Sequence, residues 1–290
     1  MSPITLALVL ASAVVHATWN LWTKELRGDH RDGPLMWTLT AISAACYAPV
    51  VVWSLAHGSW RPDVAAIGFV VVSGLIHVGY FLLLLRGYRA GDLSVVYPLA
   101  RGTGPLLSAL AAIVIFREQP SAGSVCGLAL ILTGIALLTW RGGAGRPAGP
   151  PRPAVLYGLA IGVLIAVYTL WDGWSVKRAG IPPIVFYWGG EVTRVLLFTP
   201  AALADRPAVA SLWRRHRARV LGIALLSPLS YMLVLAAMRT GPVSHIAPAR
   251  EVSIVLGAWL GSSVLGEGDR SRRLLASAAF AAGVVALALA

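Results

Sequence analysis

The sequence predicts an all-α membrane protein with ten transmembrane helices in two inverted five-helix repeats. Three observations lead to this fold class. The first is composition, because 57% of the 290 residues are hydrophobic and 12% are charged, whereas soluble domains carry about 25% charged residues. The second is a series of apolar segments long enough to cross a bilayer, and the third is a set of motifs that recurs in both halves. This composition excludes an ordinary soluble enzyme and a disordered chain.

Seven segments without Asp, Glu, Lys or Arg approach or exceed the roughly 20 residues that span a bilayer core. They are residues 1–23, 33–60, 64–85, 119–140, 153–171, 220–238 and 274–290. Three more apolar runs contain one or two charges, at residues 92–116, 182–204 and 242–266. The first segment lacks a basic start and a small-residue cleavage site, so we expect a helix there and not a signal peptide.

A linker rich in Gly, Pro and Arg lies at residues 141–153 and separates five expected helices from five. We therefore expect a first repeat at 1–140 and a second at 154–290. The segment from Trp19 to Thr23 is matched by the segment from Trp171 to Ser175, about 150 residues later.

A second correspondence joins the two halves, because Arg101 precedes Glu118 by the same interval that separates Arg250 from Glu267. A repeat with an odd number of helices must be inverted in its second copy. Inverted repeats are typical of secondary transporters.

The chain has 24 Lys and Arg residues against 12 Asp and Glu, a net charge of +12. No basic stripe interleaved with aromatic residues is present, so we do not expect nucleic acid as a partner. Most of the positive charge falls in the loops after odd-numbered helices, including the run at 213–219. The positive-inside rule then places both termini outside. Cys46 and Cys126 lie in apolar runs and are expected to be buried, inert thiols.

Two arginines are expected near the bilayer midplane. Arg101 lies about nine residues into the fourth helix and Arg250 about eight into the ninth, which is roughly 12–13 Å of rise. A cation at that depth costs at least about 2.5–3.5 kcal/mol, so each needs a wet cavity or a carboxylate partner. Pro98 and Pro248 precede the arginines and free backbone carbonyls. We interpret the pair as an anion-binding site, with structural ion pairs as the alternative.

Other charges in the apolar segments are candidates for proton coupling or charge pairing. Glu191 and Arg194 are three residues apart and can pair on one helix face. Glu251 is expected to point about 100° away from its neighbour on a continuous helix, so it needs another partner or a proton. Asp172 lies near the expected end of the sixth helix, close to water.

Aromatic and amide side chains complete the predicted substrate site. Trp19 and Asn20 lie one turn after His16, and Tyr97 lies four residues before Arg101. Trp171 repeats the pattern of Trp19 in the second half. The alternative for the tryptophans is an interfacial aromatic belt.

Signatures of catalysis and cofactor binding are missing from the sequence. It contains no Walker loop, no dinucleotide-binding glycine motif, no HExxH and no GxSxG. The histidines have no metal-ligand spacing. We therefore expect no catalytic residues, no metal and no cofactor. Three GxxxG motifs, Gly123/Gly127, Gly158/Gly162 and Gly257/Gly261, favour close helix packing and are compatible with a homodimer.

These features resemble the EamA-type branch of the drug/metabolite transporter superfamily over the whole chain. The matching pieces are the Trp-rich ends of helices one and six, the segment Gly91-Asp92-Leu93-Ser94-Val95-Val96-Tyr97-Pro98, and Glu118 and Glu267. The resemblance implies two antiparallel helical repeats around a central cavity and transport of amino acids or other small metabolites. Members usually have cytoplasmic termini, whereas the charge count places the termini outside.

We therefore expect a secondary, ATP-independent transporter of small polar metabolites in the inner cell membrane, working by alternating access. Its substrate is expected to be anionic or zwitterionic, such as an amino acid or organic acid, with its carboxylate or phosphonate group on Arg101 and Arg250. The alternatives are an exporter of cationic or apolar drugs, a lipid-modifying intramembrane enzyme and a passive channel. The expected partners are the small-molecule substrate and the lipid bilayer.

Overall fold

The computed structural model describes residues 1–26, 32–90, 93–139, 152–253 and 270–290. Every regular element in these ranges is an α-helix, and no strand occurs in them. The helices are α1 (Pro3–Leu26), α2 (Asp32–His57), α3 (Val64–Ala90), α4 (Leu93–Ile115), α5 (Ala122–Thr139), α6 (Arg152–Lys177), α7 (Pro183–Ala204), α8 (Arg206–Thr240), α9 (Val243–Ala249) and α11 (Arg270–Leu289).

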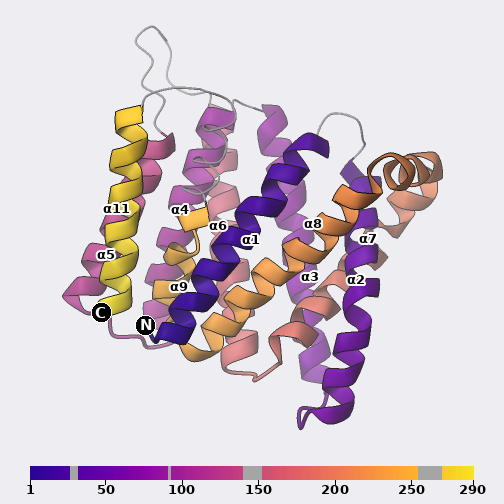
Figure 1. Ribbon diagram of the computed structural model, residues 1–290, viewed down its shortest axis with the longest axis horizontal. Helices are drawn as coiled ribbons and strands as arrows, with labels where there is room; N and C mark the ends of the chain where they lie inside the picture. The colour runs from indigo at the N-terminus through magenta and orange to yellow at the C-terminus, as the bar shows by residue number, and fades with distance from the viewer. Residues whose placement is uncertain (27–31, 91–92, 140–151, 254–269) are drawn as a thin grey trace, which may run out of the picture.

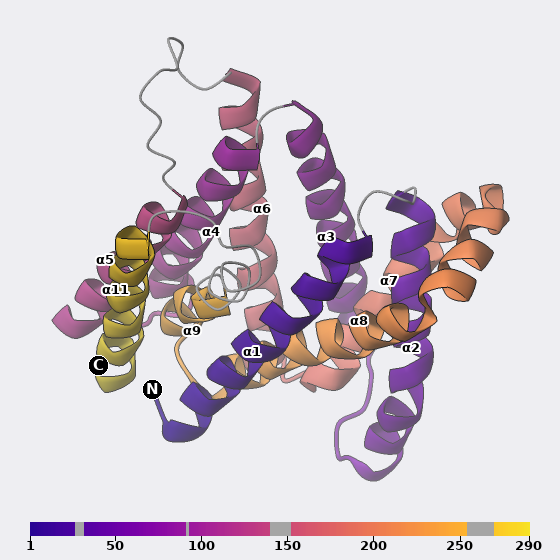
Figure 2. The ribbon, with the colours of Figure 1, turned by 45° about the horizontal axis from the view of Figure 1, so that its top comes forward.

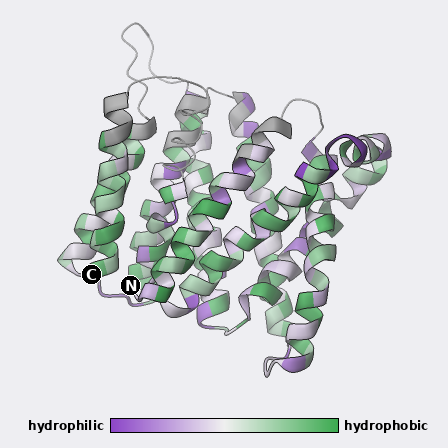
Figure 3. Cartoon of the chain, viewed as in Figure 1, coloured by the Kyte–Doolittle hydropathy of each residue, from purple (hydrophilic) through white to green (hydrophobic). Residues whose placement is uncertain are grey.

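The bundle exposes apolar side chains and buries polar ones, as a protein in lipid does. Val114 and Leu196 are 77% and 68% exposed, whereas Asp172 and Glu251 are 0% and 1% exposed. The colour of hydrophobic residues, green, recurs along the described helices in Figure 3. Among the described helices, five have stretches long and apolar enough to cross a membrane, in α1, α2, α3, α6 and α8. The chain is therefore an integral membrane protein whose described elements are all helices, while the ten-span count stays a prediction.

Helices from the two halves of the chain pack against each other in pairs. From the first half, α1 packs along α8 of the second half, and α4 packs along α6 of the second half (Figures 1 and 2). The other main pairs are α2 with α7, α3 with α6, and α5 with α11. The two termini lie at one end of the bundle, where the amino group of Met1 donates to the carbonyl of Ala288 at 2.8 Å. The expected halves are thus closely interleaved in space.

Several helices run past the limits of their charge-free segments. The charge-free segment 153–171, which predicts the sixth helix, ends before Asp172. In the structure α6 continues to Lys177 and keeps Asp172 inside the bundle. The basic run at 213–219 was counted as a loop, yet it is helical and belongs to α8, with a kink at His216 (φ −130°, ψ 21°). A charged residue shows where an apolar stretch of sequence ends, but it does not end the helix. The backbone hydrogen bonds of the helix can continue wherever the charged side chains reach water or a partner.

The ninth helix differs most from expectation. Residues 242–266 were predicted as one helix, but α9 ends at Ala249 and Arg250 is its C-terminal cap. Pro248 has no N–H to donate, and the following turn is tighter, with the Glu251 amide donating to the Pro248 carbonyl at 3.1 Å. Residues 254–269, which include Glu267 and the Gly257/Gly261 motif, lie outside the described residues. The break places Arg250 and Glu251 on a turn and not on a helix face.

Cys46 and Cys126 are exposed free thiols, so the expectation that they are buried is wrong. Both lie on apolar segments, and in a membrane bundle the apolar surface faces outward. Hydrophobic surroundings in the sequence therefore do not indicate burial in the protein interior here.

Glycines allow the closest helix contacts, and two of the GxxxG motifs are used within the chain. A Cβ on Gly162 of α6 would lie 2.7 Å from the Thr103 Cβ of α4, and a Cβ on Gly127 of α5 would lie 2.9 Å from the Gly283 carbonyl of α11. Such distances leave no room for a methyl group. These two motifs are therefore explained by packing inside one chain and are not evidence for a homodimer.

Gly162→Ala is expected to lower the free energy of unfolding by about 1–3 kcal/mol, the usual effect of overpacking. The added methyl group meets the branched Cβ of Thr103, which a rotamer change cannot move. Gly68→Ala is the matched control, because a Cβ there meets nothing within 4 Å, and it should be neutral or slightly stabilising. Thermal unfolding in detergent measures both variants, and equal unfolding temperatures would contradict the packing argument.

Candidate functional site

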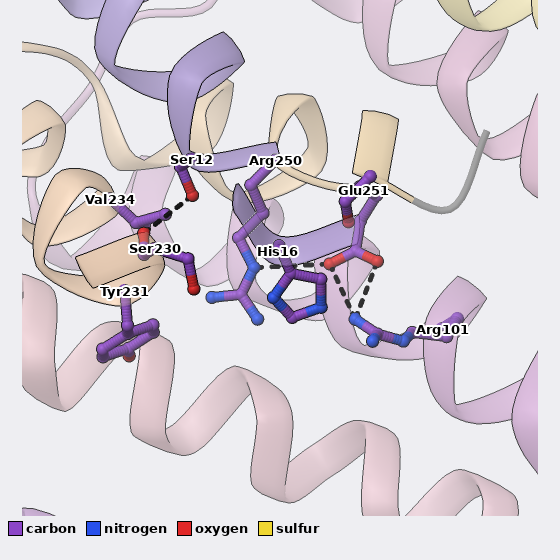
Figure 4. A pocket seen from close by; sticks show the side chains of 9 residues that line it. Ser12, His16, Arg101, Ser230, Tyr231, Val234, Arg250 and Glu251 are labelled. Atoms are coloured by element: carbon purple, nitrogen blue, oxygen red, sulfur yellow. Dashed lines mark hydrogen bonds and ion pairs between the residues drawn. The ribbon is translucent and has the colours of Figure 1, made fainter. Parts of the chain in front are cut away.

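A small polar cavity lies between α1, α4, α8 and the turn after α9. Its volume is about 40 Å³, and its lining includes Arg101, Arg250 and Glu251 together with Ser12, His16 and Tyr231. Figure 4 shows Glu251 between the two guanidinium groups. Two residues predicted from the sequence to bind an anion are therefore neighbours, although they are about 150 positions apart.

Glu251 forms ion pairs with both arginines. Arg101 Nη1 donates to Glu251 Oε2 at 2.9 Å and to Oε1 at 3.2 Å, and Arg250 Nε donates to Oε1 at 3.3 Å. The expectation that Glu251 points away from its neighbour is wrong, because the helix ends at Arg250 and the 100° rotation no longer applies. The three side chains carry a net charge of +1. In this triad the carboxylate of Glu251 offsets the charge of one arginine. The charge of the other arginine is not offset within the triad.

Arg250 is held by aromatic residues on its other side. Its Nη2 donates to the Tyr168 hydroxyl at 2.8 Å. The guanidinium carbon lies 5.7 Å from the Tyr168 ring centre and 5.8 Å from that of Tyr231, within the range of cation–π attraction. Its Nη1 is buried and has no hydrogen-bond partner among the described residues. A buried charged donor without an acceptor is costly, so this atom favours the entry of water or an anion.

The cavity is too small for a whole metabolite in this conformation. Ligand pockets usually measure about 300–1,000 Å³, whereas about 40 Å³ is room for a few water molecules. The same space matches a carboxylate-sized group. Binding of a larger molecule therefore requires the surrounding helices to move apart.

A second polar cluster surrounds Asp172 of α6, which was expected near water and is instead fully buried. Ser73 Oγ of α3 donates to its Oδ1 at 2.7 Å, and the Tyr231 hydroxyl of α8 donates to its Oδ2 at 2.6 Å. His77 of α3 places Nε2 3.7 Å from Oδ2. Three helices thus meet at this carboxylate. Tyr231 joins the cluster to the arginine cavity, because it lines the cavity and binds Asp172.

Glu191 and Arg194 of α7 form the ion pair predicted from their spacing, with Arg194 Nη2 3.0 Å from Glu191 Oε1. Both side chains are nearly buried, and Arg194 also lies 5.1 Å from the Tyr187 ring centre. Glu191 Oε2 is buried without a partner in the described part of the chain. Neither residue lines the arginine cavity. The pair joins the polar interior through Tyr187, whose ring lies 5.7 Å from that of Tyr231.

The predicted aromatic site is not assembled around the cavity. Trp19 donates from Nε1 to Ser230 Oγ at 3.3 Å, so it lies one residue away from the cavity lining. Trp171 donates to the Phe69 carbonyl at 2.9 Å and packs on the Phe69 ring. Asn20 is exposed, and its amide donates to the carbonyl of His16 in its own helix. Tyr97 belongs to α4, and its side chain lies outside the described part of the structure.

The N-terminus of α9 is fixed by Glu118, which follows α4. Glu118 Oε1 accepts from the Val243 amide at 2.8 Å and Oε2 accepts from the Ser244 amide at 3.0 Å. Lys177 lies 3.7 Å from Glu118 and donates to the Gly241 carbonyl at 2.8 Å. These bonds satisfy N–H groups that a helix start leaves open. Glu118 therefore positions the short helix that ends at Arg250.

Sequence reasoning missed the hydroxyl groups of the site. Tyr168 and Tyr231 bind the two central charges, and Ser73 completes the Asp172 cluster. Isolated Ser and Tyr residues are common in transmembrane helices, so the sequence contains no signal that separates these from the rest. Among the described residues, no group of three His, Cys, Asp or Glu side chains is arranged to hold a metal ion.

Comparisons with known proteins bear on the family and on the fold. Residues 3–140 match the model of the EamA-like transporter family. Among solved structures, one described as "Crystal structure of protein" superposes with a TM-score of 0.77 and 19% sequence identity, covering 98% of each chain. At that identity the likeness shows a shared fold alone. No curated protein matches the chain.

Proposed function

We propose, from the match of residues 3–140 to the model of the EamA-like transporter family, that the chain is a secondary transporter of small anionic or zwitterionic metabolites. The family consists of membrane transporters of small molecules, which also argues against an enzyme. We further propose alternating access as the mechanism and the inner cell membrane as the location, with the chain crossing it many times. Amino acids and organic acids are the substrate classes that fit.

The observation that supports this substrate class is the excess positive charge beside the cavity. Arg101, Arg250 and Glu251 sum to +1, and Arg250 Nη1 is buried without an acceptor in the described structure. Burying a charge inside a membrane bundle is costly unless it is paired. A substrate carboxylate at this position supplies the missing acceptor and offsets the positive charge of the triad. In this proposal Glu251 occupies part of the anion site, and the substrate competes with it for Arg250.

Alternating access is supported by the way the helices pair. If the second half repeats the first upside down, α1 corresponds to α6 and α3 corresponds to α8. The contact of α1 with α8 then has its counterpart in α3 with α6, and the contact of α2 with α8 has its counterpart in α3 with α7. Exchange of such near-equivalent contacts exposes a central site to either side in turn. The small cavity fits a closed state of this cycle.

A thermal-shift screen of the purified protein in detergent tests the substrate class. Amino acids, organic acids and phosphonates are compared with cationic dyes. We expect an anionic or zwitterionic compound to stabilise the protein, by about 2.7 kcal/mol at one hundred times its dissociation constant. Arg250→Gln should abolish this stabilisation. Arg215→Gln, at an exposed position of α8, is the control for non-specific charge effects.

Other outcomes of the screen favour other functions. Stabilisation by cationic dyes that survives Arg250→Gln and disappears in Glu191→Gln would indicate a cation exporter and would overturn the proposal. Compounds that bind are then tested for saturable uptake into proteoliposomes. Uptake that does not saturate would indicate a channel, and turnover of a labelled lipid without flux would indicate an enzyme.

A further inference from the structure

The cluster around Asp172 lacks one proton when its hydrogen bonds are counted. His77 Nδ1 lies 2.9 Å from the Ser73 carbonyl, and a carbonyl oxygen only accepts, so Nδ1 must carry the hydrogen. In the neutral ring Nε2 then has a lone pair, and it faces the Asp172 Oδ2 at 3.7 Å. Two atoms with lone pairs face each other inside the bundle. The Asp172–His77 pair therefore has a place for one added proton, on Oδ2 or on Nε2.

The added proton would keep the interior of the bundle electrically neutral when an anion binds. The arginine cavity and the two polar clusters beside it contain six charged side chains among the described residues: Arg101, Arg250, Arg194, Asp172, Glu191 and Glu251. Their sum is zero while Asp172 is ionised. A monovalent anion at Arg250 changes the sum to −1, and a net charge in a low-dielectric interior is unfavourable. One proton on the Asp172–His77 pair restores the sum to zero.

Tyr231 provides the physical link between the two sites. Its hydroxyl donates to Asp172 at 2.6 Å, and its ring faces the Arg250 guanidinium at 5.8 Å. The other titratable or charged groups that face Asp172 are Tyr168 on α6 itself, His77 on α3, the Arg194–Glu191 pair with Tyr187 on α7, and Arg250 after α9. Glu191 already neutralises Arg194. Arg250 is thus the facing cation beside which a bound anion adds a negative charge.

We propose that the Asp172–His77 pair takes up one proton when an anion binds at Arg250, so that the protein moves a monovalent anion together with a proton. The inference rests on the proposed function, because it assumes an anion at Arg250. The proton adds to Asp172 Oδ2 or His77 Nε2 from the open side and leaves to the other side with the anion. No bond other than that to the proton is made or broken. Tyr231 acts as a positioning residue that holds the carboxylate beside the cavity.

Infrared spectroscopy of the purified full-length protein tests this inference without any substrate. A protonated buried carboxyl group has a C=O stretching band of its own. We expect such a band to grow as the pH is lowered and to disappear in Asp172→Asn. Labelling Asp carboxyl groups with ¹³C should shift the band. The double change Glu191→Gln with Arg194→Gln is the matched control, because it removes another buried carboxylate together with the cation that it neutralises, and it should leave the band unchanged.

Arg250→Gln imitates the effect of a bound anion on the charge of the site. We expect the band to persist to a higher pH in this variant than in the wild type, because a cation that favours the ionised carboxylate is removed. An unchanged titration in Arg250→Gln would overturn the inference, and so would a wild type that shows neither this band nor the bands of a protonated His77 ring. Loss of the band in the Glu191→Gln/Arg194→Gln double variant would overturn it as well. If the thermal-shift screen finds no anion while the band shifts as expected, the proposed function fails and the proton site stands.

Discussion

Glu251→Gln is expected to lower the free energy of unfolding by about 3–5 kcal/mol, the effect of breaking a buried ion pair by removing one partner. Glu251 is 1% exposed, and its two oxygens accept three hydrogen bonds from Arg101 and Arg250. A glutamine amide offers one acceptor oxygen, and its NH₂ group faces guanidinium donors. Two buried cations then lie together without the negative charge between them. Thermal or denaturant unfolding in detergent measures the loss.

The matched control is the exposed ion pair between Arg89 and Asp32. Its distance is 2.8 Å, as short as the buried pair, but its side chains are 74% and 38% exposed. Asp32→Asn should therefore change stability by about 1 kcal/mol or less. If Glu251→Gln were no more destabilising than this control, the ion pairs of Glu251 with the two arginines would not contribute to the stability of the fold.

Much of the architecture could be predicted because charge is expensive in lipid. The apolar segments mark most of the helices, and Arg101 is the ninth residue of α4, as the sequence indicated. The spacing of Glu191 and Arg194 predicted an ion pair that forms at 3.0 Å. These features depend on local periodicity and on the cost of an unpaired charge, and both can be evaluated without tertiary contacts.

The parts of the site that could not be predicted depend on partners distant in sequence. Asp172 was expected near water, because nothing local shows that Ser73 and Tyr231 would bury its carboxylate. Pro248 signalled a weakened helix, yet the end of α9 at Ala249 also needs Glu118 to fix the helix start. Once that helix ends, Arg250 and Glu251 turn toward each other. A continuous-helix assumption therefore gave the wrong direction for Glu251.

Arg250→Gln is expected to reduce uptake into proteoliposomes by about 30-fold or more, measured with the compound that stabilises the wild type best. Losing one partner of a buried hydrogen-bonded charge pair costs about 2–5 kcal/mol, and each 1.4 kcal/mol is a factor of ten. Glutamine also removes the buried Nη1 donor that the substrate is proposed to satisfy. Because Arg101 still neutralises Glu251 in this variant, the protein should fold.

Two further variants separate anion binding at Arg250 from a general need for buried charge. Arg250→Lys keeps the charge but not the planar donor fork, so uptake should fall to an intermediate level. The double change Glu191→Gln with Arg194→Gln removes a buried pair that does not line the cavity, and uptake should stay within a few-fold of the wild type. Near-normal uptake by a folded Arg250→Gln protein would make Arg250 a structural partner of Tyr168 and Glu251. The substrate would then have to bind where another charge lies.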